Sequence, residues 1–360
     1  MQTIRMGIVG VGIMGRRYYA MLRALPCVEV TALCVRHLET IDDLPGEKFA
    51  DYRLLCVSGQ VDAVIIATPH YSHPLVAIEA LRHGLHVLVD KPLAVHVADG
   101  HRMLTAPRDP RLRFGVMFQE RSRPVHRTIK AMLQDGVLGD MRRVQWVVTD
   151  WFRSHAYYQS SPWRATWNGE GGGLLINQCP HHLDLLQWFV GLPTRVTAHI
   201  ALGKYHPIKV EDEVTAFLEY PNGATGVFIA STGEAPGTNR LEIVGEKGKL
   251  VLEQGTLTLF ENVMETSVFS RTTQELFARP PYQAREIPVT GDWEGPAGVL
   301  KNFRDAIVEG VPLLVPAEEA LGSLELGNAM LLSGLLHQSV DIPIDAARME
   351  RELVRLASDG

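Results

Sequence analysis

The sequence predicts an α/β fold with two domains. At 360 residues the chain is longer than one ordinary hydrophobic core accommodates. Near its start, an apolar run at residues 4–9 leads directly into a GxGxxG glycine pattern, which is typical of the first turn of a Rossmann domain. Further along, residues 194–253 read as a series of alternating strands. We therefore place a Rossmann dinucleotide-binding domain at residues 1–122 and a second domain at residues 123–360.

The composition argues against several classes of protein. An apolar content of 46% with 21% charged residues indicates a folded, soluble chain, and a net charge of −6 gives no reason to expect nucleic acid or an anionic membrane as partner. The first ten residues read as a strand and a glycine turn, without the pattern of a signal peptide. Four cysteines without CxxC spacing indicate reduced, buried thiols. We expect a cytoplasmic protein without a metal site.

The first candidate site is the glycine turn, Gly10-Val11-Gly12-Ile13-Met14-Gly15. Gly10 permits a tight turn, Gly12 lets a pyrophosphate approach the backbone, and Gly15 lets the following helix pack against the strand. Ile13 and Met14 begin that helix, whose N-terminus offers free N–H groups and a positive dipole end. We expect all five residues to contact a dinucleotide.

The second strand, residues 28–35, ends where such folds read the adenosine ribose. An NAD site normally has an aspartate or glutamate here, but this strand continues into Arg36 and His37. Both side chains suit a 2′-phosphate, so we expect NAD or NADP, with a modest preference for NADP. The alternative is that both are solvated turn residues.

The remainder of the first domain is abbreviated. Residues 38–60 are too few for a full helix, strand and helix. A buried parallel strand is expected at residues 61–68, a helix at 74–84, a strand at 86–89 and a sixth strand at 111–118.

Candidate ligand contacts follow the strands of this domain, because open α/β sheets bind ligands at the carboxyl edge. Two histidines three residues apart without a third ligand do not indicate a metal site. Lys91 can donate hydrogen bonds to a substrate oxygen, and partial burial favours its neutral form. We expect cofactor contacts from Thr68, Pro69, His70, His73, Asp90, Lys91 and Gln119.

The most polar part of the second domain is the segment 171–184, GGGLLINQCPHHLD. Helical spacing would place Asn177, His181 and Asp184 on one face. An interior proline predicts a kinked helix, or a turn followed by a helix over Pro180–Phe189. The alternative is a buried helix whose polar groups only satisfy local backbone atoms.

These motifs resemble those of the Gfo/Idh/MocA oxidoreductases, the glucose–fructose oxidoreductase and inositol dehydrogenase group. The resemblance covers essentially the whole chain. It rests on the glycine turn, on ATPHYSHP at 67–74, on Asp90-Lys91-Pro92 in place of EKP, and on the segment 171–184 in place of a GGG…D…H…D pattern. It implies a Rossmann domain followed by an α+β domain with a large, mostly antiparallel open sheet. That sheet would bind substrate on one side and form a homodimer or homotetramer on the other.

The resemblance also implies catalytic roles. Lys91 corresponds to the lysine that binds the reacting hydroxyl, and His181 to the acid or base. Asn177 stands where many members have aspartate, and an amide can orient His181 but cannot stabilise an imidazolium by charge. Asp184 could orient His181 or pair elsewhere in a salt bridge.

Aromatic and cationic residues precede the glycine run of this segment. Aromatic faces stack on sugar rings and arginine holds hydroxyls or carboxylates, so we expect a substrate lip that includes Trp163 and Arg164. The alternative is that the aromatic residues only pack a loop onto the sheet. The other elements expected here are a helix at 124–136, a strand at 141–152, hairpin strands at 214–220 and 226–230, a polar loop at 232–239, and helices at 299–310 and 317–339.

The sequence therefore predicts a nicotinamide-dependent dehydrogenase or reductase that acts on a secondary hydroxyl or ketone of a sugar, cyclitol or sugar derivative. One alternative is an NAD-using glycosidase that oxidises C3 transiently. Another is a non-enzymatic cofactor-sensing regulator. The presence of both Lys91 and His181 argues against a regulator, because a binding protein needs no proton-transfer pair.

Overall fold

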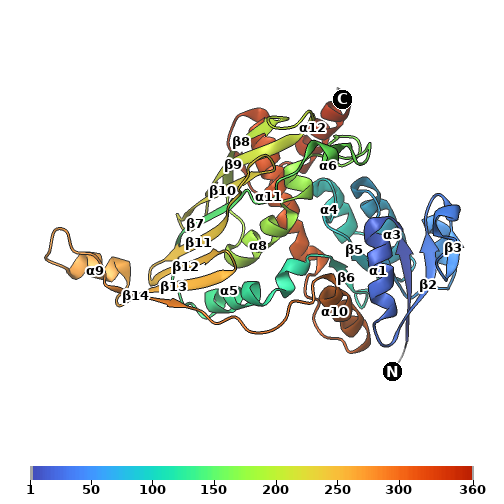
Figure 1. Ribbon diagram of the computed structural model, residues 1–360, viewed down its shortest axis with the longest axis horizontal. Coiled ribbons are helices and arrows are strands. Elements are labelled where there is room, and N and C mark those ends of the chain that lie inside the picture. The colour runs from blue at the N-terminus through green and yellow to red at the C-terminus, as the bar shows by residue number, and fades with distance from the viewer. Residues whose placement is uncertain (1–2, 359–360) are drawn as a thin grey trace.

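The structure is a computed structural model that describes residues 3–358 and contains two sheets (Figure 1). Residues 1–2 of the first predicted domain and residues 359–360 of the second lie outside the described range. Sheet A has six strands in the order β3-β2-β1-β4-β5-β6, and sheet B has nine in the order β14-β13-β12-β11-β7-β10-β9-β8-β15. The predicted fold class, a Rossmann domain joined to a large, mostly antiparallel open sheet, is confirmed.

Sheet A is entirely parallel. Its strands are β1 (Ile4–Val9), β2 (Val28–Cys34), β3 (Glu47–Phe49), β4 (Ala63–Ile66), β5 (His86–Val89) and β6 (Phe114–Val116). The α-helices are α1 (Ile13–Arg23), α2 (Tyr52–Val57), α3 (His73–Arg82) and α4 (Val97–Leu104), with 3-10 turns η1 (Leu38–Ile41), η2 (His70–Ser72) and η3 (Gln119–Ser122). Helices cover both faces, and accordingly every residue of β4 is apolar and buried.

Sheet B is antiparallel except for the neighbouring pair β7 and β10. Its strands are β7 (Met141–Val148), β8 (Arg195–Leu202), β9 (Glu211–Glu219), β10 (Thr225–Ser231), β11 (Asn239–Gly245), β12 (Gly248–Glu253), β13 (Thr256–Asn262), β14 (Tyr282–Glu286) and β15 (Val340–Asp341). The helices of this part are α5 (Pro124–Gln134), α6 (His155–Gln159), α7 (Leu174–Asn177), α8 (Pro180–Val190), α9 (Thr266–Thr272), α10 (Pro296–Val308), α11 (Ala317–Leu336) and α12 (Ala346–Ser358).

One face of sheet B is covered and the other is open. Trp146 of β7 stacks on Phe189 of α8 with ring centroids 6.3 Å apart, and α11 packs against α8 and β8. Side chains therefore alternate along β9, where Ala216 and Leu218 are buried and Phe217 between them is 44% exposed. The hairpin of β9 and β10 forms as predicted.

One helix from the C-terminal part of the chain packs on sheet A. α10 lies next to α1 (Figure 1), and its Leu300 and Phe303 join Tyr18 and Leu22 in one buried cluster. The core under the glycine turn is thus closed by residues from both ends of the sequence. Among residues 3–358, no helix is both long enough and apolar enough to cross a membrane.

Several predicted elements differ in extent. The strand expected at 141–152 ends at Val148, and the sixth strand is limited to Phe114–Val116 because Asp109 holds Arg111 and Leu112 in a turn. α4 and α12 were not predicted. Residues 255–290, which lacked a clear pattern, form β13, α9 and β14, and α9 projects away from the rest of the molecule (Figure 1).

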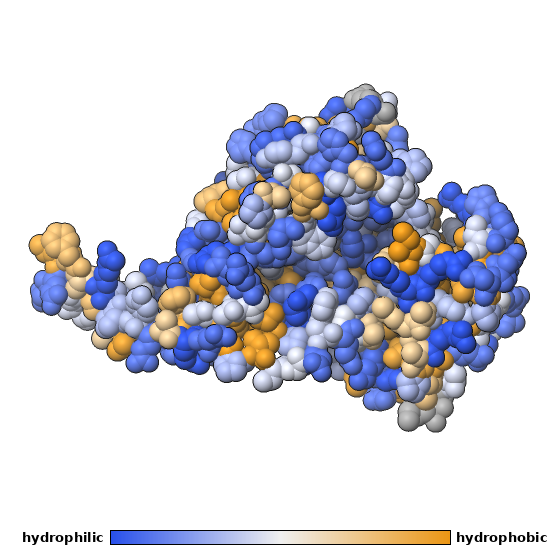
Figure 2. Space-filling model, viewed as in Figure 1, coloured by the Kyte–Doolittle hydropathy of each residue, from blue (hydrophilic) through white to orange (hydrophobic). Residues whose placement is uncertain are grey.

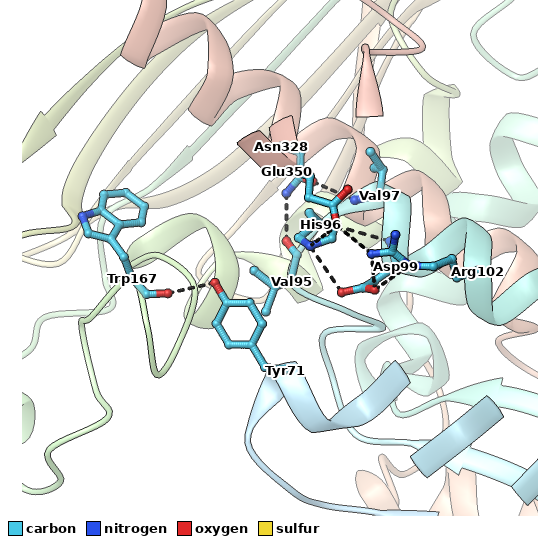
Figure 3. Close-up of polar contacts among 9 residues, drawn as sticks. All are labelled: Tyr71, Val95, His96, Val97, Asp99, Arg102, Trp167, Asn328 and Glu350. Atoms are coloured by element: carbon cyan, nitrogen blue, oxygen red, sulfur yellow. Dashed lines mark hydrogen bonds and ion pairs between the residues drawn. The ribbon is translucent and has the colours of Figure 1, made fainter. Parts of the chain in front are cut away.

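Asn328 of α11 fixes the segment that follows Lys91. Its side-chain oxygen accepts from the Val97 N–H at 3.0 Å, and its amide nitrogen donates to the Val95 carbonyl at 3.2 Å (Figure 3). Two further links in this region join Arg102 to Asp99 and Glu350, and the Tyr71 hydroxyl to the Trp167 carbonyl. The C-terminal helices and the loop before α7 therefore hold the carboxyl edge of sheet A in place.

Candidate active site

The glycine turn between β1 and α1 is tightly packed on one side and open on the other. Gly10 has a φ of +92°, and a Cβ there would lie 2.5 Å from a main-chain oxygen of the turn after β4. A Cβ on Gly15 would lie 2.0 Å from the Gly10 oxygen. At Gly12, nothing described lies within 4 Å of the Cβ position. Close packing thus requires glycine at positions 10 and 15, whereas Gly12 faces open space.

The start of α1 borders that free space. Ile13 and Met14 supply its first N–H groups, which have no acceptor within the helix. The Ile13 side chain is 73% exposed. Figure 2 shows a hollowed, mainly hydrophilic area between the surfaces over α1 and α6. The turn can therefore take a pyrophosphate at the positive end of the α1 dipole.

Beyond Cys34, at the end of β2, the structure exposes the side chains of Arg36 and His37. His37 Nδ1 lies 3.4 Å from Glu39 Oε1. Arg36 forms no ion pair with any residue in the described range 3–358. Its guanidinium therefore remains available to an anionic ligand.

Two histidines tie the turn after β4 to its neighbours. The His73 Nδ1 atom lies 2.9 Å from the Pro92 carbonyl oxygen, and its Nε2 atom lies 2.9 Å from the Thr68 carbonyl oxygen. Protein atoms therefore contact both ring nitrogens. His70 Nδ1 lies 2.9 Å from the Glu170 carbonyl oxygen, and burial lowers the pKa of His70 to about 3. Within the described range, no group of three or more potential ligand residues could hold a metal ion.

Lys91 connects the first domain to the second. Its Nζ donates to the main-chain oxygen of Asn177 at 2.7 Å and to the side-chain oxygen at 3.1 Å. Asp90 accepts from the Tyr18 hydroxyl at 3.0 Å and from the Lys91 N–H at 2.9 Å, which fixes the turn that carries the lysine. Burial lowers the pKa of Lys91, while the charges of Asp90 and Glu170 oppose that shift.

Asn177 is held on both sides by hydrogen bonds. While its oxygen faces Lys91, its amide nitrogen donates to the Glu170 carboxylate and, at 3.1 Å, to the Tyr157 hydroxyl. Glu170 is buried, and its other carboxylate oxygen accepts from the Ala165 N–H at 2.6 Å. Sequence reasoning missed Glu170. The only signal in the sequence was an acidic residue immediately before three glycines. Position 177 carries an amide where many family members have a carboxylate, and here the Glu170 carboxylate contacts that amide.

His181 lies on the other side of the site. Its Nε2 is 3.1 Å from the Gln119 amide nitrogen, and its buried Nδ1 has no partner among the described residues. The ring sits edge-on to Phe118. Burial lowers the pKa of His181 well below its usual range, and the nearby charge of Lys91 adds to the shift. The imidazole is therefore neutral at neutral pH.

The expectation that Asn177, His181 and Asp184 share one helix face is wrong. The chain breaks after α7, where the Cys179 N–H bonds to Leu174, and a new helix starts at Pro180 as predicted. Asp184 faces Arg121, whose Nε and Nη2 each donate to it at 2.7 Å. This buried ion pair joins η3 to α8, and Asp184 does not contact His181.

The predicted lip residues gather around Tyr157 and His70. The Trp163 ring meets His70 edge to face with centroids 6.0 Å apart. Arg164 lies over the rings of Trp163 and Tyr157, at 5.0 and 4.6 Å, and donates to the Tyr157 hydroxyl at 2.9 Å. Through Asn177, this lip is continuous with the Lys91 contacts.

Comparison with known families identifies both domains. Residues 4–118 match the oxidoreductase family with an NAD-binding Rossmann fold, and residues 126–251 match the GFO/IDH/MocA C-terminal domain. The chain belongs to the Gfo/Idh/MocA oxidoreductases. The resemblance noted from the motifs is thereby confirmed across both domains.

Two relatives of known activity are dehydrogenases. The trans-1,2-dihydrobenzene-1,2-diol dehydrogenase of Bos taurus is 28% identical over 319 residues, which is 86% of this chain and 90% of the relative. The levoglucosan dehydrogenase of Pseudarthrobacter phenanthrenivorans is 25% identical, over 95% of this chain and 99% of the relative. The protein is thus an NAD-binding oxidoreductase related to sugar dehydrogenases.

Solved structures share the fold. The WlbA dehydrogenase from Bordetella pertussis, in complex with NADH and UDP-GlcNAcA, superposes with a TM-score of 0.81 at 24% identity, covering 96% of this chain and 99% of that one. Levoglucosan dehydrogenase in complex with NADH and levoglucosan gives a TM-score of 0.78 at 21% identity, covering 95% of this chain and 100% of that one.

Proposed function

We propose that this protein is an NAD(P)-dependent dehydrogenase or reductase for a secondary hydroxyl or ketone of a sugar, cyclitol or sugar derivative. One observation carries the proposal: Lys91, at the carboxyl edge of the cofactor sheet, is bonded to Asn177 of the second domain with a neutral His181 nearby. The named relatives, which act on a dihydrodiol and on levoglucosan, support this substrate class. The cofactor supplies the hydride acceptor in oxidation and the hydride donor in reduction.

The glycine turn holds the cofactor pyrophosphate in this proposal, through the N–H groups at the start of α1. Arg36 is exposed, and within the described range its guanidinium forms no ion pair with a carboxylate. This guanidinium would contact a 2′-phosphate. We retain the modest preference for NADP on this basis. The cited solved relatives contain NADH, so both cofactors belong in the assay.

Lys91 binds the reacting hydroxyl. A lysine ammonium has three N–H donors, and two of those of Lys91 are engaged by Asn177. The third is available to a substrate oxygen, where it stabilises the negative charge that develops as the hydroxyl loses its proton. The lowered pKa of Lys91 makes this proton easier to share.

His181 is the acid or base. A neutral imidazole can accept the hydroxyl proton during oxidation and return it during reduction. The low pKa of His181 keeps it in the accepting form. Asn177 orients Lys91, and two carboxylates, Asp90 and the Glu170 behind Asn177, supply the negative charge that opposes loss of the Lys91 proton. Glu170 therefore acts as a positioning residue.

A substrate panel tests the proposal. Purified protein is assayed with NAD and NADP against sugars, cyclitols and aryl glycosides, following NAD(P)H formation and glycoside cleavage. Reduced cofactor formed in step with a ketone product is expected. Aryl glycoside cleavage with no net NADH would identify the NAD-using glycosidase instead. Cofactor binding without any reaction across the panel would favour the regulator.

We also propose assembly as a homodimer or homotetramer through the open face of sheet B. On this face Phe217 of β9 is 44% exposed, and the half-buried Val227 and Ile229 of β10 lie beside it. An apolar sheet face of this kind needs a cover. Light scattering should give a mass of two or four chains, and Phe217→Glu should lower it.

A further inference from the structure

Two arginine side chains lie over the Tyr157 ring, and Lys91 is linked to the same tyrosine through Asn177. The guanidinium carbons of Arg153 and Arg164 lie 4.9 and 4.6 Å from the centre of its ring. Lys91 is connected to the same residue, since Asn177 accepts from the Lys91 Nζ and donates to the Tyr157 hydroxyl, each at 3.1 Å. Two hydrogen bonds from Lys91 thus lead to the tyrosine, and a third leads on to Arg164 at 2.9 Å. The three cations are thus linked to one another through Asn177 and Tyr157.

These arginines lack the counter-charge that most arginines of the protein have. Arg121, for example, is paired in both directions, with Asp184 and with Glu319. Within residues 3–358, neither Arg153 nor Arg164 has a carboxylate within 4.0 Å. The buried Nε of Arg153 has no hydrogen-bond partner there at all. An unpaired buried donor is costly unless a ligand satisfies it.

Glu170 does not neutralise this cluster. Its carboxylate is already engaged by the Ala165 N–H and the Asn177 amide. Two carboxylates, Glu170 and the Asp90 next to Lys91, therefore act against three cations. The excess positive charge also acts on the lysine: burial lowers the pKa of Lys91, and the charges of Arg164 and Arg153 lower it further.

The main chain of Arg153 is fixed in place. Its N–H donates to the Thr232 carbonyl at 2.9 Å, and its carbonyl faces His206 Nε2 at 2.8 Å. The other ring nitrogen of His206 lies 3.0 Å from Asp212, and both residues are buried. Arg153 is consequently presented from a rigid base, as expected of a binding residue whose position must be preorganised.

We propose that the substrate carries an anionic group, a carboxylate or phosphoryl, which Arg153 and Arg164 bind while its reacting hydroxyl lies at Lys91. The guanidinium fork matches either anion by paired N–H donors. This inference rests on the proposed function, because it names the substrate class of the same site. The Tyr157 ring holds both guanidinium groups by cation–π contacts and so helps to position the two arginines.

Matched substrates provide the test. The kcat/KM values of glucose, glucuronate and glucose 6-phosphate are compared, and likewise those of galactose and galacturonate. We expect an anionic member to exceed its neutral counterpart by roughly 10- to 100-fold, the value of hydrogen bonds to a charged group. The uronate and phosphate arms decide which anion the site takes. Equal values, or a preference for the neutral sugars, would overturn the inference and leave the dehydrogenase proposal standing.

Substitutions locate the anion site. Arg153→Gln and Arg164→Gln should each reduce the ratio of anionic to neutral kcat/KM about 10-fold, and Arg164→Lys should reduce it less because it keeps the charge. Arg142→Gln, which alters an arginine of β7 that is already paired with Glu246, is the matched control and should leave the ratio unchanged. An unchanged ratio in both glutamine variants contradicts the assignment.

A binding measurement separates this inference from the proposed function. Calorimetric titration of glucuronate and glucose 6-phosphate into the protein with NADH requires no turnover. Binding that the two glutamine substitutions abolish, in protein that never transfers hydride, would keep the anion site and overturn the dehydrogenase proposal. If neither anion binds or reacts, the inference is wrong.

Discussion

The two halves of the candidate site are built in different ways. The cofactor turn occupies six consecutive residues, Gly10–Gly15, and works through main-chain N–H groups and close packing. The proposed catalytic seam, formed by Lys91, Asn177, Glu170 and His181, joins residues up to 90 positions apart through buried and half-buried side chains. Local backbone geometry can therefore preserve cofactor binding when the seam is damaged, whereas the seam depends on two domains remaining in register.

A large expected effect on turnover alone distinguishes the two halves at His181. We expect His181→Ala to lower kcat by roughly 100- to 10,000-fold, because the proton acceptor is lost. The dissociation constant for NAD(P)H, measured by fluorescence titration, should change less than about twofold, since the glycine turn is untouched. A variant that loses cofactor binding to the same extent as activity would show that the two halves are not independent.

Breaking the ion pair beside the seam should reduce stability. Asp184→Asn leaves Arg121 buried with only the partly exposed Glu319 as counter-charge, so we expect a loss of about 3 kcal/mol in the free energy of unfolding. Chemical denaturation measures it. Glu318→Gln, which removes an exposed partner of Arg108, is the control and should cost less than about 1 kcal/mol. Equal losses in the two variants would contradict a structural role for the buried pair.

The pH profile should reflect the environment of the seam rather than that of an exposed histidine. Because burial and the charge of Lys91 lower the pKa of His181, the acidic limb of kcat/KM for oxidation should lie below pH 6.5. Below that limb the rate should fall about tenfold per pH unit. The unfolded chain binds the His181 proton at a higher pH than the folded one, so this group also makes stability fall as the pH drops below 6.5. An acidic limb above pH 6.5 would be inconsistent with a buried, neutral base.

The smallest expected effect concerns the cofactor half. Arg36→Ala should raise the KM for NADP about tenfold, the value of one hydrogen bond to a charged group, and leave the KM for NAD nearly unchanged. Initial rates with both cofactors measure the ratio. If the KM values for NAD and NADP rise equally, Arg36 does not read the 2′-phosphate.

The same contrast explains what could be predicted from the sequence. The glycine turn, the β9–β10 hairpin and the helix start at Pro180 are encoded by neighbouring residues, and all three form as expected. Helical spacing alone could not foresee that the chain breaks between α7 and α8, so Asn177 and Asp184 face different partners.

The candidate site contains residues that only tertiary contacts could identify. Glu170 and Arg153 fall in loops without periodic pattern, and their importance arises from Asn177 and Tyr157 lying beside them. Likewise, nothing near residue 300 in the sequence indicates that α10 packs beside α1.

Replacement of Lys91 tests the central claim most directly. Lys91→Ala should abolish measurable NAD(P)-dependent turnover of the substrate identified by the panel, because the donor to the reacting oxygen is lost. Stopped-flow mixing of the variant with oxidised cofactor and substrate should give no burst of reduced cofactor, while fluorescence titration still shows NAD(P)H binding. Turnover at the wild-type rate in folded Lys91→Ala protein would contradict the account.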